Sequence, residues 1–487
     1  MNYTRKVAFN TLVQMLGKLV GTAVAMGTVA LLFRYLGVNG VGKYTTIFAF
    51  VASFSILADF GLQWTLIREL SIQKNTDKVF SNIFALRLIL AIIIHLLTFA
   101  VVWLFKYPLD VKYGVGVITC AYFFTTLNMV PVGVFLSKYR LDISVATEVV
   151  GRILVFILVW IFTRNNYPLT VVLSAYLFGG VLNYFLNLTF VKRFVRIRLA
   201  FDYQYWKKVF YQAVPIGIVL VFGLIYFKID SIMLSLMKDM NDVGIYGTAY
   251  KLLEVLETIP AMFLGAAFPL ITKYAVSKDE RVRPAFQKQF DFLSLMALPV
   301  VSGVFVLSGS IISFISGSRG GEFINASTIS VMGSPATSVT CLKILIFVVG
   351  INFFTSLYSY LVVSIGEQKR MIVPMILFAL LNIVMNLILI PKYSYIGASV
   401  ATIMTEVVVL AVYIRLSARL VKLPINFGTF LRLILCAGFM GLAVYFFEKI
   451  GVNLFVNIAL GAMVYGVLAV VSGAVSIGAV RQFLSRS

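Results

Sequence analysis

Three basic side chains in the first half of the chain lie inside long apolar runs: Lys18, Arg87 and Arg152. A charged group at bilayer depth is costly in lipid, so it must face a water-filled cavity or find a partner. Together the three would make a cationic, substrate-binding cavity suited to an anionic headgroup. Arginine can bind a phosphate through two parallel hydrogen bonds and keeps its charge when it is partly buried.

Lys18 is the most informative of these residues because it lies roughly 15 Å into its apolar run, too deep to reach the interface easily. On an otherwise apolar helix, it belongs to a polar stripe at three- and four-residue spacing that also contains Thr11, Gln14 and Thr22. This pattern predicts a helix face exposed to a wet cavity. The alternative is an ion pair of Lys18 with a carboxylate of another span, such as Asp59 or Glu148.

The two arginines differ in their sequence surroundings. Glu148 precedes Arg152 by four residues, the favourable order for a helical ion pair, so Arg152 can serve structure as well as substrate. Arg87 has no local acidic partner, which favours a substrate-facing role.

Three ionisable residues of the second half, Lys251, Glu254 and Glu257, are spaced by three and share one helical face. Lys251 and Glu254 can form an ion pair, which leaves Glu257 as a second carboxylate one turn away. Two carboxylates so close in a cavity of low dielectric compete for a proton, so Glu254 and Glu257 are candidates for ion coupling. The alternative is a structural network that locks the helices together.

Other deep charges have further roles open to them. Glu406 is a third candidate for ion coupling, or a partner for a cation such as Lys343. Lys228 and Asp230 lie near the outer end of their predicted span, where snorkelling or a gate contact is expected rather than substrate binding. The residues assigned to a gate or a structural network are Asp59, Glu148, Lys228, Asp230 and Lys251.

The sequence contains no pattern typical of nucleotide or metal chemistry. It has one histidine, His95, and no GxxxxGK[ST] loop, HExxH motif or Cys/His cluster. We therefore predict no catalytic residue, no metal, no cofactor and no enzyme activity. His95 lies in an apolar run, where we expect a hydrogen-bonded core residue rather than a proton relay.

Membrane helices are the elements that must position these residues. The 487 residues are 61% hydrophobic and 12% charged, whereas soluble domains are typically about 25% charged. Apolar runs of about 20 residues can each cross a bilayer as a helix. We predict fourteen such spans: 8–33, 42–64, 80–105, 113–136, 146–163, 168–191, 209–236, 243–268, 287–316, 338–363, 370–390, 395–416, 427–447 and 453–477.

The net charge of +22 reflects membrane orientation in this reading, not nucleic-acid binding. Most basic residues fall in the short loops assigned to the inner side, as the positive-inside rule requires. The predicted location is the plasma (inner) membrane, with both termini cytoplasmic.

The chain also looks duplicated. The string NGVGKY at 39–44 is repeated at four of six positions by NDVGIY at 241–246. We interpret both strings as outer turns, where glycine permits close backbone approach and tyrosine fits an interfacial belt. A basic, aromatic segment at 192–208 separates the copies and is expected at an anionic inner leaflet. The predicted all-α fold has two pseudo-symmetric six-helix bundles and two extra C-terminal helices, at 1–205, 206–418 and 419–487.

The stretch from 226 to 254, YFKIDSIMLSLMKDMNDVGIYGTAYKLLE, resembles the D-x-x-x-L … V-G-x-Y-x-x-A-x-K signature of a family of prokaryotic flippases. These are the Wzx-type O-antigen and polysaccharide flippases of the multidrug/oligosaccharidyl-lipid/polysaccharide exporter superfamily. Supporting stretches are RYLGVNGVGKYTTIFAF, LADFGL, FPLITKY and LNIVMNLILIPKYSYIGASVATIMTE. The motifs mark the family and not the glycan.

The resemblance implies a flippase that moves an isoprenoid-(pyro)phosphate-linked oligosaccharide to the outer leaflet for surface polysaccharide assembly. It implies alternating access, an ion gradient as the driving force, and a prokaryotic plasma membrane. The partners it implies are the polyprenyl-linked oligosaccharide, membrane lipids and a polysaccharide polymerase or chain-length machinery, with no nucleic acid.

Three alternatives stay open. A multidrug or cation antiporter of the same superfamily would be expected to have twelve spans and an acidic first-half cavity. A peptidoglycan-precursor flippase differs only in its overall motif pattern. A membrane polysaccharide polymerase or ligase typically needs a large outer loop, whereas the longest predicted outer segment here is 317–338.

Overall fold

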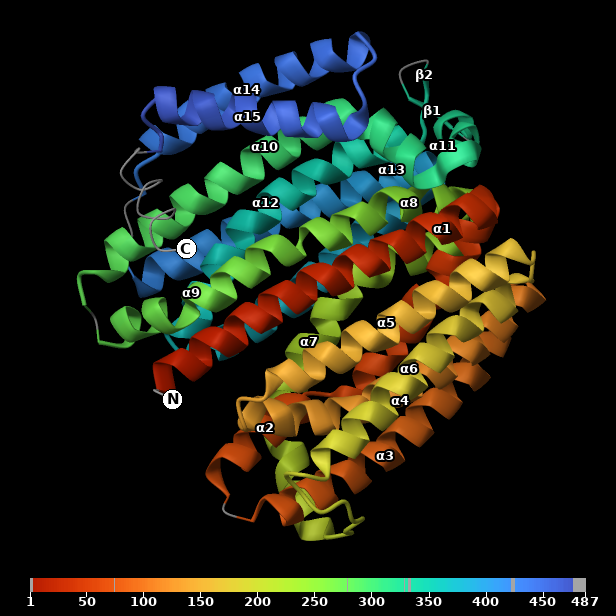
Figure 1. The fold of residues 1–487 in the computed structure, drawn as a ribbon, viewed down its shortest axis with the longest axis vertical. Coiled ribbons are helices and arrows are strands. Elements are labelled where there is room, and N and C mark those ends of the chain that lie inside the picture. Colours follow the sequence, from red (N-terminus) through yellow and green to blue (C-terminus); the bar gives the residue numbers. More distant parts are fainter. Residues whose placement is uncertain are drawn as a thin grey trace. The chain divides into compact units, whose positions relative to one another are not determined.

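The computed structural model describes residues 3–73, 75–277, 279–327, 329–331, 334–421 and 425–475. Most of them are helical (Figure 1). Two short strands, β1 (Ser330–Val331) and β2 (Ser334–Pro335), pair antiparallel, with Ser330 opposite Pro335. Within the described residues, eleven helical segments are long and apolar enough to cross a membrane. The predicted all-α, multi-pass membrane class is confirmed, while the number of fourteen spans stays a prediction.

The chain forms two compact units. Unit 1 comprises 1–244 and 371–387, and unit 2 comprises 245–370 and 388–487. Unit 1 therefore contains sequence from both sides of the basic segment at 192–208, whereas unit 2 lies entirely after it. The predicted domains at 1–205, 206–418 and 419–487 stay a prediction.

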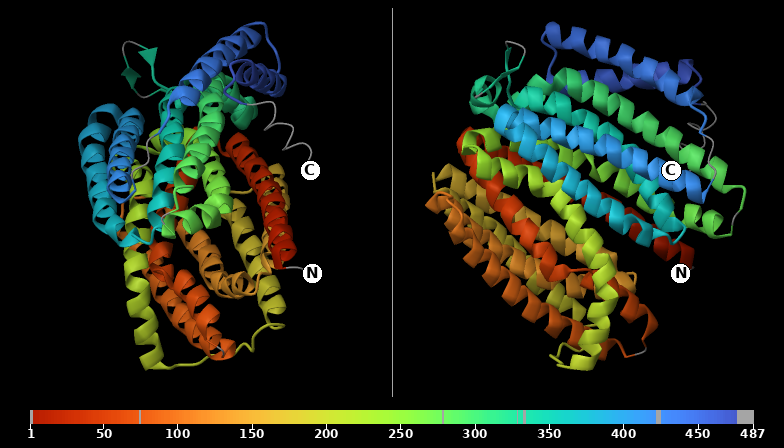
Figure 2. Two further views of the ribbon diagram at one scale, coloured as in Figure 1. Left: turned by 90° about the vertical axis from the view of Figure 1, so that its left-hand side faces the viewer. Right: turned by 180° about the vertical axis from the view of Figure 1, so that it is seen from behind.

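Unit 1 is built from long helices that pack lengthwise. In both views of the ribbon, α3, α4, α5 and α6 run side by side, and α1 contacts α4, α5 and α7 (Figures 1 and 2). An apolar core with members on α2, α3, α4, α6 and α7 includes Leu66, Phe80 and Val134. The elements of this unit are α1 (Tyr3–Asp59), α2 (Leu62–Ile72), α3 (Thr76–Val101), η1 (Val102–Leu104), α4 (Leu109–Ser137), α5 (Leu141–Arg164), α6 (Leu169–Val191), α7 (Tyr203–Met237), the first residues of α8 (Met240–Leu256) and the first part of α13 (Ile372–Leu420).

Unit 2 is organised around α10, which contacts α12, α14 and α15. Its core between α10, α14 and α15 includes Leu307, Met440 and Tyr465. Besides the remainders of α8 and α13, its elements are α9 (Thr258–Val276), α10 (Val282–Ser316), η2 (Gly317–Arg319), α11 (Gly320–Asn325), the β1–β2 pair, α12 (Ser338–Ser364), η3 (Gln368–Met371, whose last residue belongs to unit 1), α14 (Gly428–Lys449) and α15 (Leu454–Val471).

Two helices each cover a pair of predicted spans. In α1 the helical backbone is interrupted at Gly37, with φ 65° and ψ −177°. In α13 it is interrupted at Ser394, with φ 43°. Glycine adopts positive φ at no steric cost, whereas for serine this conformation is unfavourable. The breaks expected between these spans are therefore present, as kinks between two helical segments and not as polar loops.

The two repeated strings meet through their glycines. A Cβ atom on Gly42 would overlap the carbonyl oxygen of Met240, and one on Gly244 would overlap the carbonyl oxygen of Val38. Each glycine thus lies against the residue four positions before the other. The predicted close backbone approach is confirmed, and it joins the two copies of the motif to each other.

The structure corrects two details of the repeated strings. Both strings lie in helix, after the kink of α1 and at the start of α8, and not in a turn. Their tyrosines do not lie in an interfacial belt, because Tyr44 is 5% exposed and Tyr246 is fully buried. The Tyr44 hydroxyl lies 3.3 Å from that of Tyr176, and the Tyr246 hydroxyl lies 3.4 Å from that of Thr402.

Candidate functional site

Arg87 is fully buried on α3 and forms an ion pair with Asp59 at the end of α1. Its Nη1 group donates to Oε1 of Gln63 on α2 at 3.1 Å, and Nη2 lies 3.5 Å from Sδ of Met129 on α4. The guanidinium therefore ties together four helices of unit 1. As expected, Arg87 has no partner nearby in the sequence, but it has a distant one in Asp59. Its substrate-facing role stays a prediction.

Asp59 is held in place by the break between α1 and α2, which the predicted span at 42–64 did not foresee. Phe60 has φ 36° and Gly61 has φ 80°. A Cβ on Gly61 would lie 2.8 Å from the carbonyl oxygen of Ala213 on α7, so close packing on α7 requires glycine there. Asp59 Oδ1 accepts the N–H of Gln63 at 3.2 Å. The LADFGL stretch is therefore the turn that presents Asp59 to Arg87.

Arg152 and Glu148 form the ion pair that their spacing predicted, with 2.5 Å between Nη2 and Oε1. Arg152 also donates from Nη1 to the carbonyl oxygen of Gly21 on α1 at 3.0 Å. The side chains of Arg152 and Glu148 are 39% and 44% exposed. The guanidinium therefore lies on the α1–α5 surface within reach of solvent.

Lys18 is exposed on α1, one turn before Gly21. Among the described residues, its ammonium group makes no hydrogen bond or ion pair. The two partners considered for it are engaged elsewhere, Asp59 with Arg87 and Glu148 with Arg152. Of the predicted polar stripe, Gln14 and Thr22 are half-buried, and the side chain of Thr11 lies outside the described residues.

The acidic residues of unit 2 lie on α8 and α13 and at the α8–α9 junction. Lys251 Nζ lies 2.7 Å from Oε2 of Glu254, as their spacing predicted. Glu257 is half-buried at the junction of α8 and α9. Glu406 on α13 is 1% exposed. The ammonium of Lys343 lies 5.5 Å from the Phe305 ring centroid. Coupling roles for the three glutamates stay a prediction.

Asp230 takes part in a buried polar network between α7 and the first part of α13. It is 1% exposed, and its Oδ1 accepts a hydrogen bond from Nδ2 of Asn386 at 2.5 Å. Asn386 also donates to the carbonyl oxygen of Asn382 at 2.9 Å. The ammonium of Lys228 lies 5.5 Å from the Phe227 ring centroid. The contacts of Asp230 are those of a structural network, and a gate role stays a prediction.

His95 is the hydrogen-bonded core residue that the sequence predicted. It is 5% exposed, with Nδ1 2.8 Å from the carbonyl oxygen of Ala91 and Nε2 3.4 Å from the hydroxyl of Ser55. In the described ranges of the chain, no group of three or more His, Cys, Asp or Glu side chains is placed to hold a metal ion.

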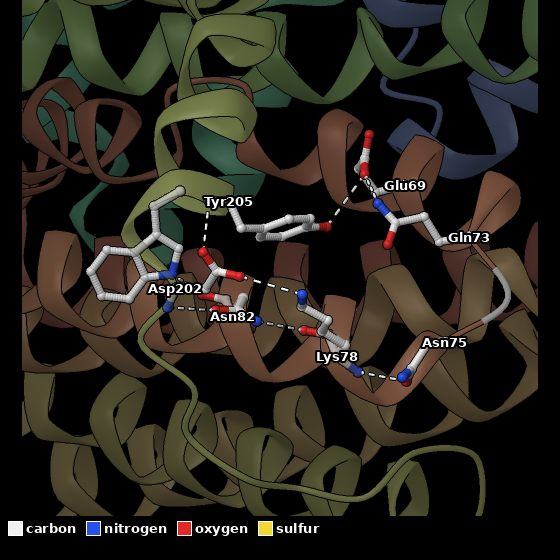
Figure 3. A network of polar contacts seen from close by, with 8 residues as sticks. Glu69, Gln73, Asn75, Lys78, Asn82, Asp202 and Tyr205 are labelled. Atoms are coloured by element: carbon white, nitrogen blue, oxygen red, sulfur yellow. Dashed lines mark hydrogen bonds and ion pairs between the residues drawn. The ribbon is translucent and has the colours of Figure 1, made fainter.

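The basic segment between α6 and α7 is anchored on α3 by contacts that sequence reasoning missed (Figure 3). The N–H of Asp202 donates to Oδ1 of Asn82 at 3.0 Å, and Nε1 of Trp206 donates to the carbonyl oxygen of Asn82 at 2.9 Å. Lys78 Nζ lies 3.3 Å from Oδ2 of Asp202. A single asparagine thus fixes both the end of the segment and the start of α7.

Asp202 also caps α7, because its Oδ1 accepts the N–H of Tyr205 at 3.0 Å. That hydrogen bond, with the nearby Lys78 ammonium, lowers the pKa of the Asp202 carboxyl below its ordinary value. The Tyr205 hydroxyl donates to Oε2 of Glu69 on α2 at 3.3 Å (Figure 3). In the sequence, the only signal for this network is Asp202 itself, because an aspartate just before a helix is a typical N-cap residue.

Comparison with known proteins was made by sequence and by fold. The model of a family described as polysaccharide biosynthesis protein matches residues 7–275. The probable flippase AglR of Haloferax volcanii is 22% identical over 181 residues, which are 37% of this chain. The match spans 35% of that protein's length.

Two solved structures share the fold over most of the chain. The lipid II flippase MurJ in an inward closed conformation superposes with a TM-score of 0.77 at 13% identity, covering 95% of this chain and 98% of that one. An inward-facing multidrug resistance MATE transporter of the MOP superfamily gives 0.64 at 13% identity, covering 84% and 98%. The chain therefore has the fold of MOP superfamily transporters.

Proposed function

Because the chain belongs to the polysaccharide biosynthesis protein family, we propose that it is a flippase for an isoprenoid-(pyro)phosphate-linked oligosaccharide. It would carry this lipid from the inner to the outer leaflet by alternating access, for surface polysaccharide assembly. The observation that carries the anionic substrate class is Lys18, exposed within a membrane helix and, among the described residues, in no ion pair. A lysine at that depth is costly in lipid and is expected to meet water and an anion.

Arg152 would complete the phosphate-binding surface with Lys18. Its Nη1 group contacts Gly21 one turn from Lys18, so both cations border the same part of α1. Glu148 balances one of the two positive charges, which leaves the surface with a net positive charge for a phosphate. Arg87 would then act indirectly, by fixing the α1–α2 turn through Asp59.

Ion coupling would use the acidic residues of unit 2. We assign proton binding first to Glu257, which is half-buried at the junction of α8 and α9. Glu406 is a further candidate, because its carboxyl group is buried in a membrane-crossing helix, where ionisable residues are typically functional. The protein would lie in a prokaryotic plasma membrane with cytoplasmic termini and would pass its product to a polymerase or chain-length machinery.

The test is the leaflet location of lipid-linked oligosaccharide in host cells with and without the gene. Outer-face accessibility would be measured with a membrane-impermeant label and mass spectrometry. We expect inner-face accumulation in the deletion strain, relieved by the wild-type gene and not by Lys18→Ala. Equal outer-face labelling in both strains, in a host without a redundant flippase, would refute the proposal.

A second candidate is flipping of a peptidoglycan precursor. It is favoured by the fold likeness to the lipid II flippase, which covers 95% of the chain. Expression in cells depleted of their own lipid II flippase would separate the two functions. Restored growth would favour the peptidoglycan precursor, and continued lysis with normal surface-glycan export would favour the first proposal.

A further inference from the structure

A cavity of about 440 Å³ lies between α9 and the start of α10 in unit 2. One wall is apolar, since it contains the Phe263 and Phe292 rings, which stack at 4.1 Å between centroids with 21° between their planes. The lining also includes the polar and basic residues Tyr274, Arg281, Lys288 and Gln289. The lining is therefore amphipathic.

The basic side chains lie at the end of a membrane-crossing helix. Lys288 is exposed, and no hydrogen bond or ion pair of its ammonium is found in the part of the chain that the structure describes. Arg281 lies 4.9 Å over the Tyr274 ring and donates from Nη2 to Oδ2 of Asp279 at 2.6 Å. This contact lowers the pKa of Asp279, so Asp279 stays ionised and balances Arg281. Lys288 then supplies the net positive charge.

Gln289 adds a polar group to this lining. It is 7% exposed, and its amide makes no hydrogen bond with any described residue. A ligand with hydrogen-bond acceptors can therefore bind to this amide.

We propose that the α9–α10 cavity binds a glycerophospholipid of the bilayer that carries an anionic headgroup. Its phosphate would lie between Lys288 and Arg281, a headgroup or ester oxygen would accept from the Gln289 amide, and a hydrocarbon chain would follow Phe263 and Phe292. A bilayer lipid is the occupant because α10 begins at Val282, so the cavity lies at one end of a membrane span. There the polar headgroup meets the first methylene groups of the chain. Bulk lipid also saturates such a site by mass action.

The site can be tested by native mass spectrometry on the full-length, delipidated protein titrated with defined lipids. The wild type should bind its first phosphatidylglycerol molecule about tenfold more tightly than its first phosphatidylcholine molecule. This ratio of dissociation constants corresponds to about 1.4 kcal/mol of binding free energy. Lys288→Gln should remove most of that preference. Gln289→Leu should lower the affinity for phosphatidylglycerol about fivefold, the effect expected for the loss of one hydrogen bond. The matched control is Arg283→Gln, which removes the same charge from an exposed position of α10 that does not line the cavity.

Four results would overturn the proposal. One is an equal loss of the preference for phosphatidylglycerol in Lys288→Gln and Arg283→Gln, which would mean that the overall charge of the protein, and not this cavity, sets the preference. A second is no preference for phosphatidylglycerol over phosphatidylcholine. A third is tighter binding of polyprenyl phosphate than of phosphatidylglycerol, which would make the isoprenoid carrier the occupant. The fourth is displacement of phosphatidylglycerol by inorganic phosphate alone. Because Lys288 is exposed, its variant should fold, and the melting temperature would verify this.

Discussion

Arg87 and Lys18 carry the same charge in opposite environments. Arg87 is fully buried against Asp59, whereas Lys18 is exposed and, among the described residues, makes no ion pair. Removing one partner of a buried ion pair leaves an uncompensated charge in a medium of low dielectric, while removing an exposed charge costs little stability. Variants of the two residues should therefore separate folding from transport.

We expect Arg87→Met to destabilise the protein by about 3–5 kcal/mol, because it leaves Asp59 buried without its partner. Asp59→Leu should have a similar effect. The double variant should recover much of the loss, since an apolar pair of similar volume is often neutral in such a place. Unfolding of the purified protein in detergent, followed as a double-mutant cycle, measures the coupling. Normal stability of Arg87→Met with loss of export would instead assign Arg87 to the substrate.

Lys18→Ala should abolish export with little change in melting temperature, and Lys18→Arg should retain part of the activity because it keeps the charge. The measurement is outer-leaflet lipid-linked oligosaccharide in a deletion strain. Lys207→Ala is the matched control, since it also removes an exposed lysine, near the start of α7. Wild-type export by Lys18→Ala would remove Lys18 from the substrate site.

Local spacing predicted the ion pairs that lie within one helix, and it failed for the pair that links two. Arg152 with Glu148 and Lys251 with Glu254 are one turn apart, so helical geometry alone brings them together. Arg87 finds Asp59 only because the chain breaks at Phe60 and Gly61 and packs on α7. Such a contact depends on tertiary packing, which periodicity does not contain.

At the scale of elements, the segment between α6 and α7 is held by hydrogen bonds as well as by apolar side chains such as Val195. Asp202 is the centre of this anchor, because it caps α7, contacts Lys78 and donates its N–H to Asn82. A lowered pKa means that the folded state favours the ionised carboxylate. This stabilisation is present above the ordinary pKa of aspartate and is lost as the pH falls through the lowered value.

We therefore expect hydrogen exchange at the Tyr205 amide, corrected for intrinsic rate, to increase as the pH falls from about 5 to about 3. Asp202→Asn should remove most of this pH dependence, since asparagine can still cap the helix but does not titrate. The amide of Lys78, capped by Asn75 at 3.0 Å, is an internal control that should not follow the same curve. An unchanged pH dependence in Asp202→Asn would exclude Asp202 as the titrating group.

The contact between the two repeated strings makes an equally direct prediction. Gly42→Ala should lower stability by at least about 1–3 kcal/mol, the usual cost of overpacking, because its Cβ would overlap the carbonyl oxygen of Met240. Gly223→Ala in α7 is the control. Its Cβ would meet nothing within 4 Å, and alanine is preferred to glycine within a helix by about 0.5–1 kcal/mol. We expect a lower melting temperature for Gly42→Ala and an unchanged or higher one for Gly223→Ala. Equal shifts in the two variants would contradict the close contact at Gly42.

At the scale of the whole molecule, hydropathy predicted the class of protein and left its subdivision open. Apolar runs long enough to span a membrane identify a helical bundle without any tertiary information. The gaps between predicted spans, 34–41 and 391–394, contain the breaks at Gly37 and Ser394, but hydropathy does not show that the backbone there is kinked without a loop. Nor does it predict that 371–387 belongs to the unit containing the first part of the chain, because that assignment follows from packing.

Energy coupling is also a property of the whole molecule, since a proton bound at one carboxylate must bias the transport cycle. If Glu257 is the coupling residue, Glu257→Gln should abolish the pH dependence of turnover while leaving substrate binding and melting temperature near wild type. Proteoliposomes with an imposed proton gradient and a labelled isoprenoid-linked oligosaccharide would measure turnover, with Glu280→Gln as an exposed control outside the described helices. A wild-type pH profile in Glu257→Gln would end this assignment and direct attention to Glu406, whose carboxyl group is buried on α13.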